Sequence, residues 1–236
     1  MSSGTAEAAG AKTGTGTGVG SGTAGSGRAG SGTPGITAQT ILVCAIIGTT
    51  QMTWGTIVPA LPLYIDRFGA TAAVLGAIIA AFGLGRALVN IPAGLALRWW
   101  RPRPFLHVVC WALVVVTALT GLSPDVGALI GARVLAGILG GSAITVGFAV
   151  LVGGAPADRR GRVMSTATAV QMSAGAIGAF LGGLALTWLP LALAFVVAAV
   201  PLVLCLIGDL LRPAASYWAA PLGRPAAGLE PGSAAP

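Results

Sequence analysis

Six apolar stretches, each long enough to cross a lipid bilayer, dominate this chain. A bilayer core of roughly 30 Å is crossed by about 20 helical residues, because each residue of a helix rises about 1.5 Å. The sequence predicts spanning helices at about 41–65, 72–97, 105–122, 126–152, 164–188 and 189–207. The boundary between the last two rests on Trp188, Leu189 and Pro190 alone, so five spans is the alternative. We therefore expect an all-α, integral membrane six-helix bundle.

Composition supports a membrane protein. Charged residues make up 8% of the chain, whereas soluble domains carry roughly a quarter. The formal net charge is +7. In a soluble protein that excess would suggest nucleic acid as a partner, but here the cations lie between apolar runs, where they set topology. We expect the lipid bilayer as a partner and no nucleic acid.

The arginines predict the orientation of the bundle. Three lie in the connection at 98–104, three lie in the connection at 158–162, and Arg212 follows the last span. Arg67 stands alone in the connections of the other side. Because short cytoplasmic connections are enriched in Lys and Arg, the pattern places both termini in the cytoplasm. We expect a multi-pass protein of the plasma membrane.

The two flanks differ from the spans in composition. Residues 1–35 are mostly Gly, Ser, Thr and Ala, and residues 212–236 are rich in Ala and Pro. Such segments bury too little apolar surface to offset the entropy of ordering. The sequence predicts two disordered cytoplasmic tails around a membrane bundle at 36–211.

Small residues recur at four-residue spacing within the spans. They are Gly76 and Ala80, then Gly137 and Gly141, and then Ala174, Gly178 and Gly182. Small residues on one helix face let backbones approach closely, which is a main source of helix association in lipid. Either a helix pair within this chain uses these faces, or a partner shares them.

Two arginines lie inside predicted spans. Arg86 shares a helix face with Asn90, one turn later. Arg133 lies about 10 Å from the outer end of its helix by the rise per residue. A charged residue at this depth is costly unless it faces a polar cavity or has a partner. Arg86 either faces such a cavity or snorkels or bonds locally, and Arg133 either lines a cavity or bonds to backbone or hydroxyl oxygens.

Other polar residues in the spans are weaker candidates for a solute pathway. Gln51 and Trp54 share a face of the first span, as do Gln171 and Ala174 in the fifth. An amide beside an indole gives one polar handle and one aromatic wall for a small ligand.

Titratable groups for proton coupling are scarce. His107, at the start of the third span, is either an interfacial residue or a proton-sensitive group. Asp66, Asp125, Asp158 and Asp209 all fall at predicted helix ends or in connections. We therefore expect no carboxylate placed for proton coupling in this bundle.

Enzymatic chemistry is not expected. The sequence lacks a Ser/His/Asp grouping, a phosphate-binding Gly-Lys-Thr loop and a metal-spaced cluster. Its three cysteines are far apart in sequence and fall within apolar segments, where they act as small buried residues. We predict no cofactor and no metal site.

Four motifs, in order, resemble the N-terminal half of the major facilitator superfamily. IPAGLALRWWRPRP is similar to the signature connection after the second helix, with Gly94, Arg98 and Arg101 matching if one residue is deleted and Leu97 replacing the usual Asp. RVLAG, with Arg133 and Gly137, resembles the fourth-helix motif. DRRGRVMS at 158–165 resembles the next cytoplasmic connection. GAFLGG resembles the fifth-helix motif of exporters through its glycines, Gly178, Gly182 and Gly183.

The resemblance implies alternating access, in which two six-helix bundles rock around a site near the bilayer midplane. By position, Gln51, Trp54 and Arg133 would line the cavity for a small solute. The second and fifth helices would form gates, and the Gly178–Gly183 face would pack across the interface between bundles. Since Leu97 replaces the Asp that helps latch the two halves, that latch is not expected here.

Three functions fit a six-span bundle of this kind. The first is a solute or drug transporter that works as a homodimer or with a separate second half. The second is a truncated or degenerate transporter half without activity. The third is a non-transport membrane protein that binds or regulates a partner through its small-residue faces. The missing Asp favours the last two, and Arg133 with the fifth-helix glycines favours the first.

Overall fold

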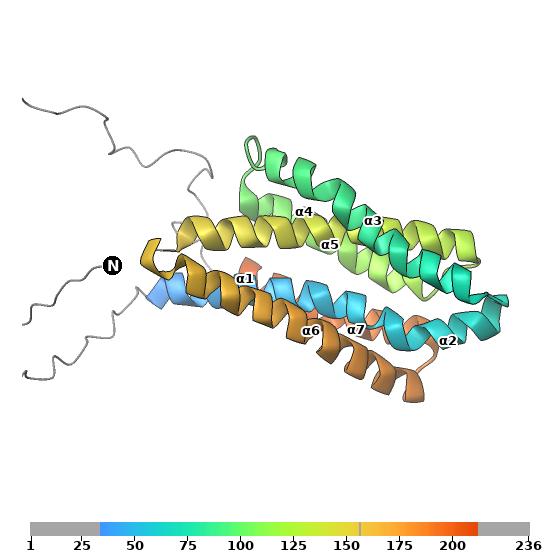
Figure 1. Cartoon of the computed structure of the whole chain (residues 1–236). Helices are drawn as coiled ribbons and strands as arrows, with labels where there is room; N and C mark the ends of the chain where they lie inside the picture. Colours follow the sequence, from blue (N-terminus) through green and yellow to red (C-terminus); the bar gives the residue numbers. More distant parts are fainter. Residues whose placement is uncertain (1–33, 156, 212–236) are drawn as a thin grey trace, which may run out of the picture. The chain divides into compact units, whose positions relative to one another are not determined.

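The computed structural model describes residues 34–155 and 157–211, and its regular elements there are all helices. In chain order they are α1 (Pro34–Gly55), α2 (Ile57–Phe68), α3 (Ala72–Ala96), α4 (Pro102–Thr120), α5 (Val126–Gly154), the 3-10 helix η1 (Ala157–Arg159), α6 (Arg160–Trp188) and α7 (Leu191–Leu210) (Figure 1). The predicted all-α bundle is confirmed. The predicted disordered tails fall almost wholly at 1–33 and 212–236, outside the described residues.

Six segments of the described chain are long and apolar enough to cross a membrane. The first, Thr40–Phe68, combines α1 with α2, and each of the others contains one long helix. The alternative of five spans is wrong, because α6 ends at Trp188 and the backbone at Leu189 is extended. Pro190 then precedes the first turn of α7, a position that needs no backbone N–H donor.

The first span is interrupted at Thr56, between α1 and α2. Pro59 lacks a backbone N–H, and its ring crowds the carbonyl of Gly55 four residues earlier, so the helix breaks one turn before the proline. The first span is therefore broken into two arms, α1 and α2. Gly69 ends α2 with φ 61°, a left-handed conformation that glycine adopts without strain.

Two parallel helix pairs, α3 with α5 and α1 with α6, make the most extensive helix contacts in the bundle. A Cβ on Gly137 would meet the carbonyl oxygen of Phe82 in α3, and one on Gly178 would meet that of Met52 in α1. Gly182 faces Thr56 in the same way. Both pairs therefore depend on glycine for the approach of backbone to backbone.

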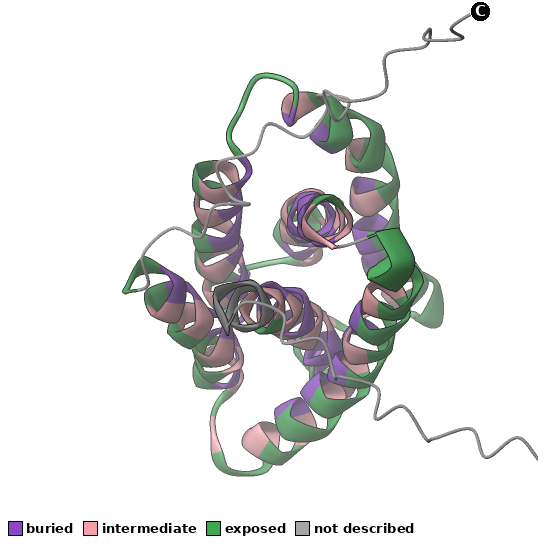
Figure 2. Ribbon diagram, turned by 90° about the vertical axis from the view of Figure 1, so that its left-hand side faces the viewer, coloured by how far each residue is buried: buried purple, intermediate pink, exposed green. Residues whose placement is uncertain are grey.

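The helices differ in how much of their surface they bury. α5 is the most buried span, whereas α3 and α6 bury the smallest share (Figure 2). The larger apolar core joins residues of α1, α4, α5 and α7, among them Ile47, Leu113, Val146 and Leu202. A smaller core joins α2 to α5 and α7 around Tyr64, Leu129 and Phe195. Among the described spans, those of α3 and α6 thus leave the largest share of their residues uncovered.

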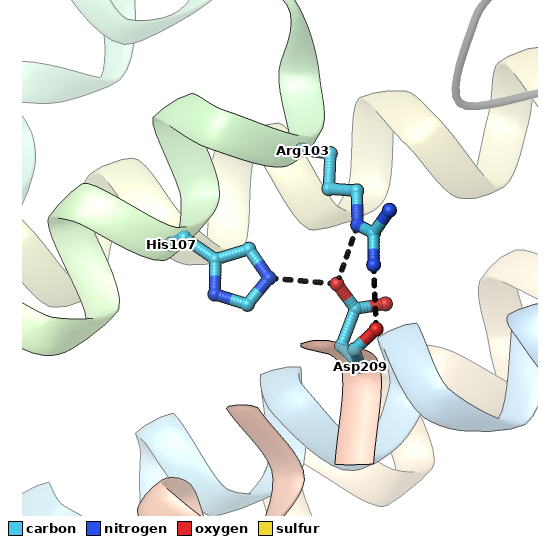
Figure 3. Close-up of polar contacts among 3 residues, drawn as sticks. All are labelled: Arg103, His107 and Asp209. Carbon is cyan, nitrogen blue, oxygen red and sulfur yellow. Dashed lines mark hydrogen bonds and ion pairs between the residues drawn. The ribbon is translucent and has the colours of Figure 1, made fainter. Parts of the chain in front are cut away.

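A polar cluster of Arg103, His107 and Asp209, called the tie below, joins the first turns of α4 to the last turn of α7 (Figure 3). Asp209 Oδ2 accepts hydrogen bonds from Arg103 Nε at 2.8 Å, and it lies 2.7 Å from His107 Nε2. Arg103 also donates to the backbone oxygen of Asp209. Asp209 is 1% exposed. Asp209 thus lies at a helix end, as the sequence predicts, and it is buried there with Arg103 and His107 as its partners.

The close contact of α6 with α1 at Gly178 gives a stability prediction. Replacing Gly178 with Ala places a methyl group against the backbone of Met52, so the helices must separate. Overpacking of this kind costs about 1–3 kcal/mol. We expect a lower midpoint of thermal unfolding in detergent, measured by tryptophan fluorescence. Gly83→Ala is the matched control, because a Cβ there would contact nothing within 4 Å.

The tie at Asp209 gives a second prediction. Asp209→Asn removes the carboxylate that accepts a hydrogen bond from Arg103, and we expect a loss of about 2 kcal/mol, since a hydrogen bond between charged groups contributes roughly 1.5–3 kcal/mol. The control is Asp158→Asn, whose carboxylate is 75% exposed and lies 3.6 Å from Arg159. Surface pairs of this type contribute little, so the control should unfold as the wild type does. Equal unfolding midpoints for both variants would contradict a stabilising role of the tie.

Candidate solute pathway

The six polar residues that the sequence predicts for a solute pathway do not form one cluster. They lie on four helices: Gln51 and Trp54 on α1, Arg86 and Asn90 on α3, Arg133 on α5 and Gln171 on α6. The structure places them in four separate environments.

Arg133 lies inside the bundle near the end that holds α2. It is 2% exposed, and its Nη2 donates a hydrogen bond of 2.9 Å to Thr120 Oγ1. The hydroxyl of Tyr64 donates to the backbone oxygen of the same threonine at 2.9 Å. Arg133 Nε is buried and has no hydrogen-bond partner among the described residues. Of the two sequence-based alternatives, the bond to a hydroxyl oxygen is the one present, and the buried Nε is left without a partner.

Gln51 and Gln171 lie on the two helices of the α1–α6 pair. Gln171 is 4% exposed, and neither its Nε2 nor Gln51 Oε1 has a partner in the described part of the chain. Gly175, one turn after Gln171, faces Gln51: a Cβ there would lie 3.6 Å from Gln51 Cγ. A buried amide without a hydrogen bond costs about 1–3 kcal/mol, so these two groups are poised to bond a further polar group.

Trp54 does not pair with Gln51 as the wall of a ligand site. Its ring packs edge-on against Phe82 of α3, with centroids 5.4 Å apart and an interplanar angle of 69°. The indole is partly buried and contacts both apolar cores. In this conformation Trp54 joins α1 to α3.

Arg86 and Asn90 lie along the contact between α3 and α5. Asn90 Oδ1 accepts a hydrogen bond of 3.2 Å from Thr145 Oγ1. A Cβ on Gly141 would lie 3.0 Å from Arg86 Cγ, so the stem of the arginine crosses α5 at that glycine. Arg86 is partly buried, and the described residues give it no hydrogen bond or ion pair. Asn90 thus has a local bond, whereas the local-bond alternative for Arg86 finds no partner in the described residues.

The signature-like connection behaves as a surface segment except at one position. Gly94, Arg98 and Arg101 are exposed, whereas Leu97 is 8% exposed and packs in the larger core. The side chain that replaces the family's latch carboxylate is thus turned into the bundle.

The fifth-helix glycines differ from what the resemblance implies. Gly178 and Gly182 pack against α1 of the same chain, and Gly183 lies near Pro59, with 3.5 Å from an added Cβ to the proline ring. The expectation that this face packs across an interface between bundles is therefore a mistaken one for Gly178 and Gly182. Of the two alternatives for the small-residue faces, the helix pair within the chain applies here.

Two apolar grooves run beside α6 that the sequence analysis did not predict. One, of about 500 Å³, lies between α1, α6 and α7 and includes Met52, Leu181 and Trp188. The other, of about 440 Å³, lies between α1 and α6 and includes Thr49 and Ser173. Such volumes suit a small organic molecule. The described residues contain no group of three or more potential metal ligands.

The partners that tertiary packing brings to the charged groups were not predictable from the sequence. Tyr64 and Thr120 meet at Arg133, and Asp209 meets Arg103 and His107. The spacing of Arg103 and His107, one helical turn apart, was a weak signal for a shared anionic partner. Nothing in the sequence indicated that this partner would come from α7, the last span.

Comparison with known proteins agrees with the helical arrangement. A protein of Lactococcus lactis subsp. lactis (strain IL1403) described as a multi-drug resistance efflux pump PmrA homolog is 29% identical over 161 residues, which are 65% of this chain and 38% of that protein. The chain also resembles the crystal structure of a bacterial homologue of the human lysosomal transporter Spinster, in an inward-facing and unoccupied conformation. The TM-score is 0.68 at 15% identity, over 76% of this chain and 43% of that one.

The chain thus spans less than half the length of both proteins. The family resemblance noted in the sequence is confirmed independently by a family model that matches residues 43–232. Because this family model covers most of a chain that carries six membrane-capable segments, the protein belongs to the Major Facilitator Superfamily.

Proposed function

We propose that the chain moves a small solute across the membrane by alternating access, as one bundle of a two-bundle transporter. The observation that carries the proposal is a set of buried hydrogen-bonding atoms without partners inside apolar spans: Arg133 Nε, Gln51 Oε1 and Gln171 Nε2. In a bilayer such groups find no water, so keeping them unbonded is costly. A solute or a rearranged helix that forms hydrogen bonds with these atoms would recover that free energy. A conformational cycle requires such a difference in interaction between its states.

The solute class follows from the grooves and from the relative. The spaces beside α6 are apolar and offer few polar groups. The relative from Lactococcus lactis is described as a multi-drug efflux pump. Together these support export of a small, mostly apolar organic molecule with one or two polar groups. The arginines determine the proposed orientation. Arg98, Arg101 and the 158–162 segment lie on the cytoplasmic side of the plasma membrane.

A second bundle is part of the proposal. One six-helix bundle has no opposite wall to close around a solute, and α3 and α6 keep large exposed faces. A second copy of this chain or a separate half would supply that wall. The same exposed faces also support the alternative, in which the chain binds or regulates a membrane partner without transporting anything.

Efflux measurements separate transport from partner binding. We expect Gln171→Leu to lower the initial rate of ethidium efflux from energised cells by about fivefold to tenfold, because a lost hydrogen bond is worth roughly 1–1.5 kcal/mol. Met172→Leu is the matched control, since Met172 is the neighbouring residue and is 60% exposed. Membrane levels of each variant are compared by immunoblot.

Arg133→Ala extends the test to α5, and Arg133→Lys tests whether charge alone suffices. Transport that depends on the forked donor of arginine should fail in both variants. Efflux at the wild-type rate in Gln171→Leu and Arg133→Ala would remove the assigned pathway. Absence of efflux in cells that contain the wild-type chain and its second bundle would favour the partner-binding alternative.

A further inference from the structure

Arg86 is a charged side chain near the middle of the membrane with no counter-charge in its own bundle. Leu84 is the midpoint of α3, and Arg86 lies two residues beyond it, about 3 Å further along the helix axis. Neither a hydrogen bond nor an ion pair joins it to any residue that the structure describes. Ala96, the last residue of α3, is about 15 Å away, beyond the reach of a snorkelling arginine.

The acidic residues of the described chain cannot serve as its partner. Asp66, Asp125 and Asp158 lie at or beyond helix ends, and Asp209 is held by Arg103 and His107. An unpaired guanidinium at this depth is not compatible with a face turned to hydrocarbon. The face that carries Arg86 must therefore meet something that is neither lipid nor this bundle.

The stem of Arg86 is held in place by the α3–α5 contact. It crosses α5 at Gly141, and one turn later Asn90 is bonded to Thr145. These contacts fix the position of the guanidinium relative to two helices, so an oppositely charged group could dock there without much ordering of the arginine.

The same helix carries a face made for close approach. Gly76, Gly83 and Gly94 are exposed, and a Cβ added at any of them would contact nothing within 4 Å. Ala80 and Ala87 are exposed as well. In lipid, small residues let a second helix come near enough for backbone contact and for short polar bonds.

We propose that α3 docks against a helix of a second bundle that is not a copy of this chain and that carries an Asp or Glu near the middle of its span, in an ion pair with Arg86. This inference rests on the proposed function only for the existence of a second bundle. A second copy does not provide the pair, because the spans of this chain hold no unpaired carboxylate at that depth. The distribution of charge in this chain therefore favours a separate half over a homodimer.

A designed peptide pair tests this charge complementarity directly. The probes are two Leu/Ala transmembrane peptides that differ in one central residue, Glu in one and Gln in the other. Their association with the full-length, dye-labelled chain is measured by energy transfer in phosphatidylcholine nanodiscs at pH 8. We expect the Glu peptide to bind about tenfold more tightly than its Gln twin. Arg86→Gln should abolish the preference, and Arg98→Gln, which removes an exposed charge outside the spans, should preserve it.

Three outcomes would overturn the proposal. One is equal binding of the two peptides to the wild-type chain, and another is a preference that persists in Arg86→Gln. The third is Arg86-dependent binding of benzoate, but not benzamide, without any peptide preference, which would assign the site to an anionic solute. None of these measurements involves flux, so their failure leaves the efflux test of the proposed function standing.

Discussion

Helices gain little hydrophobic free energy by leaving lipid for one another, so this bundle depends on close backbone packing. Two parallel pairs provide it, α3 with α5 and α1 with α6. In both pairs the later helix contributes glycine, at Gly137 and Gly178, directly under a carbonyl of the earlier helix. The remaining helices pack around these pairs, with the buried α5 at the centre.

The same glycines determine where polar groups lie. Gly141 leaves room for the stem of Arg86, and Gly175 leaves room for the side chain of Gln51. Larger residues at either position would push these groups away from the helix contact. In this fold, glycines at the helix contacts therefore do two things. They let two helices approach closely, and they leave room for a polar side chain beside the contact.

Much of the fold follows from local properties of the sequence. Apolar length predicts all six spans within a few residues, and Pro190 and Gly69 mark real helix boundaries. The pairing of helices was not predictable in the same way. Four-residue spacing of glycine shows that a face packs closely, but it does not show against what, and the partner of Gly178 is α1 of the same chain. The tie between Asp209 and Arg103 was missed for the same reason, because it joins residues 106 positions apart.

The two intramembrane arginines illustrate how tertiary structure separates residues that look alike in sequence. Arg133 is surrounded by the bundle, donates a hydrogen bond to Thr120, and keeps a buried Nε without a partner among the described residues. Arg86 lies at the edge of a helix contact, partly exposed, beside a face of small residues that no described residue covers. Because lipid cannot solvate a guanidinium, the first arginine is a feature of the interior and the second marks a surface that remains to be covered. An inside–outside distinction of this kind is what lets one bundle carry both the proposed solute site and the proposed docking site.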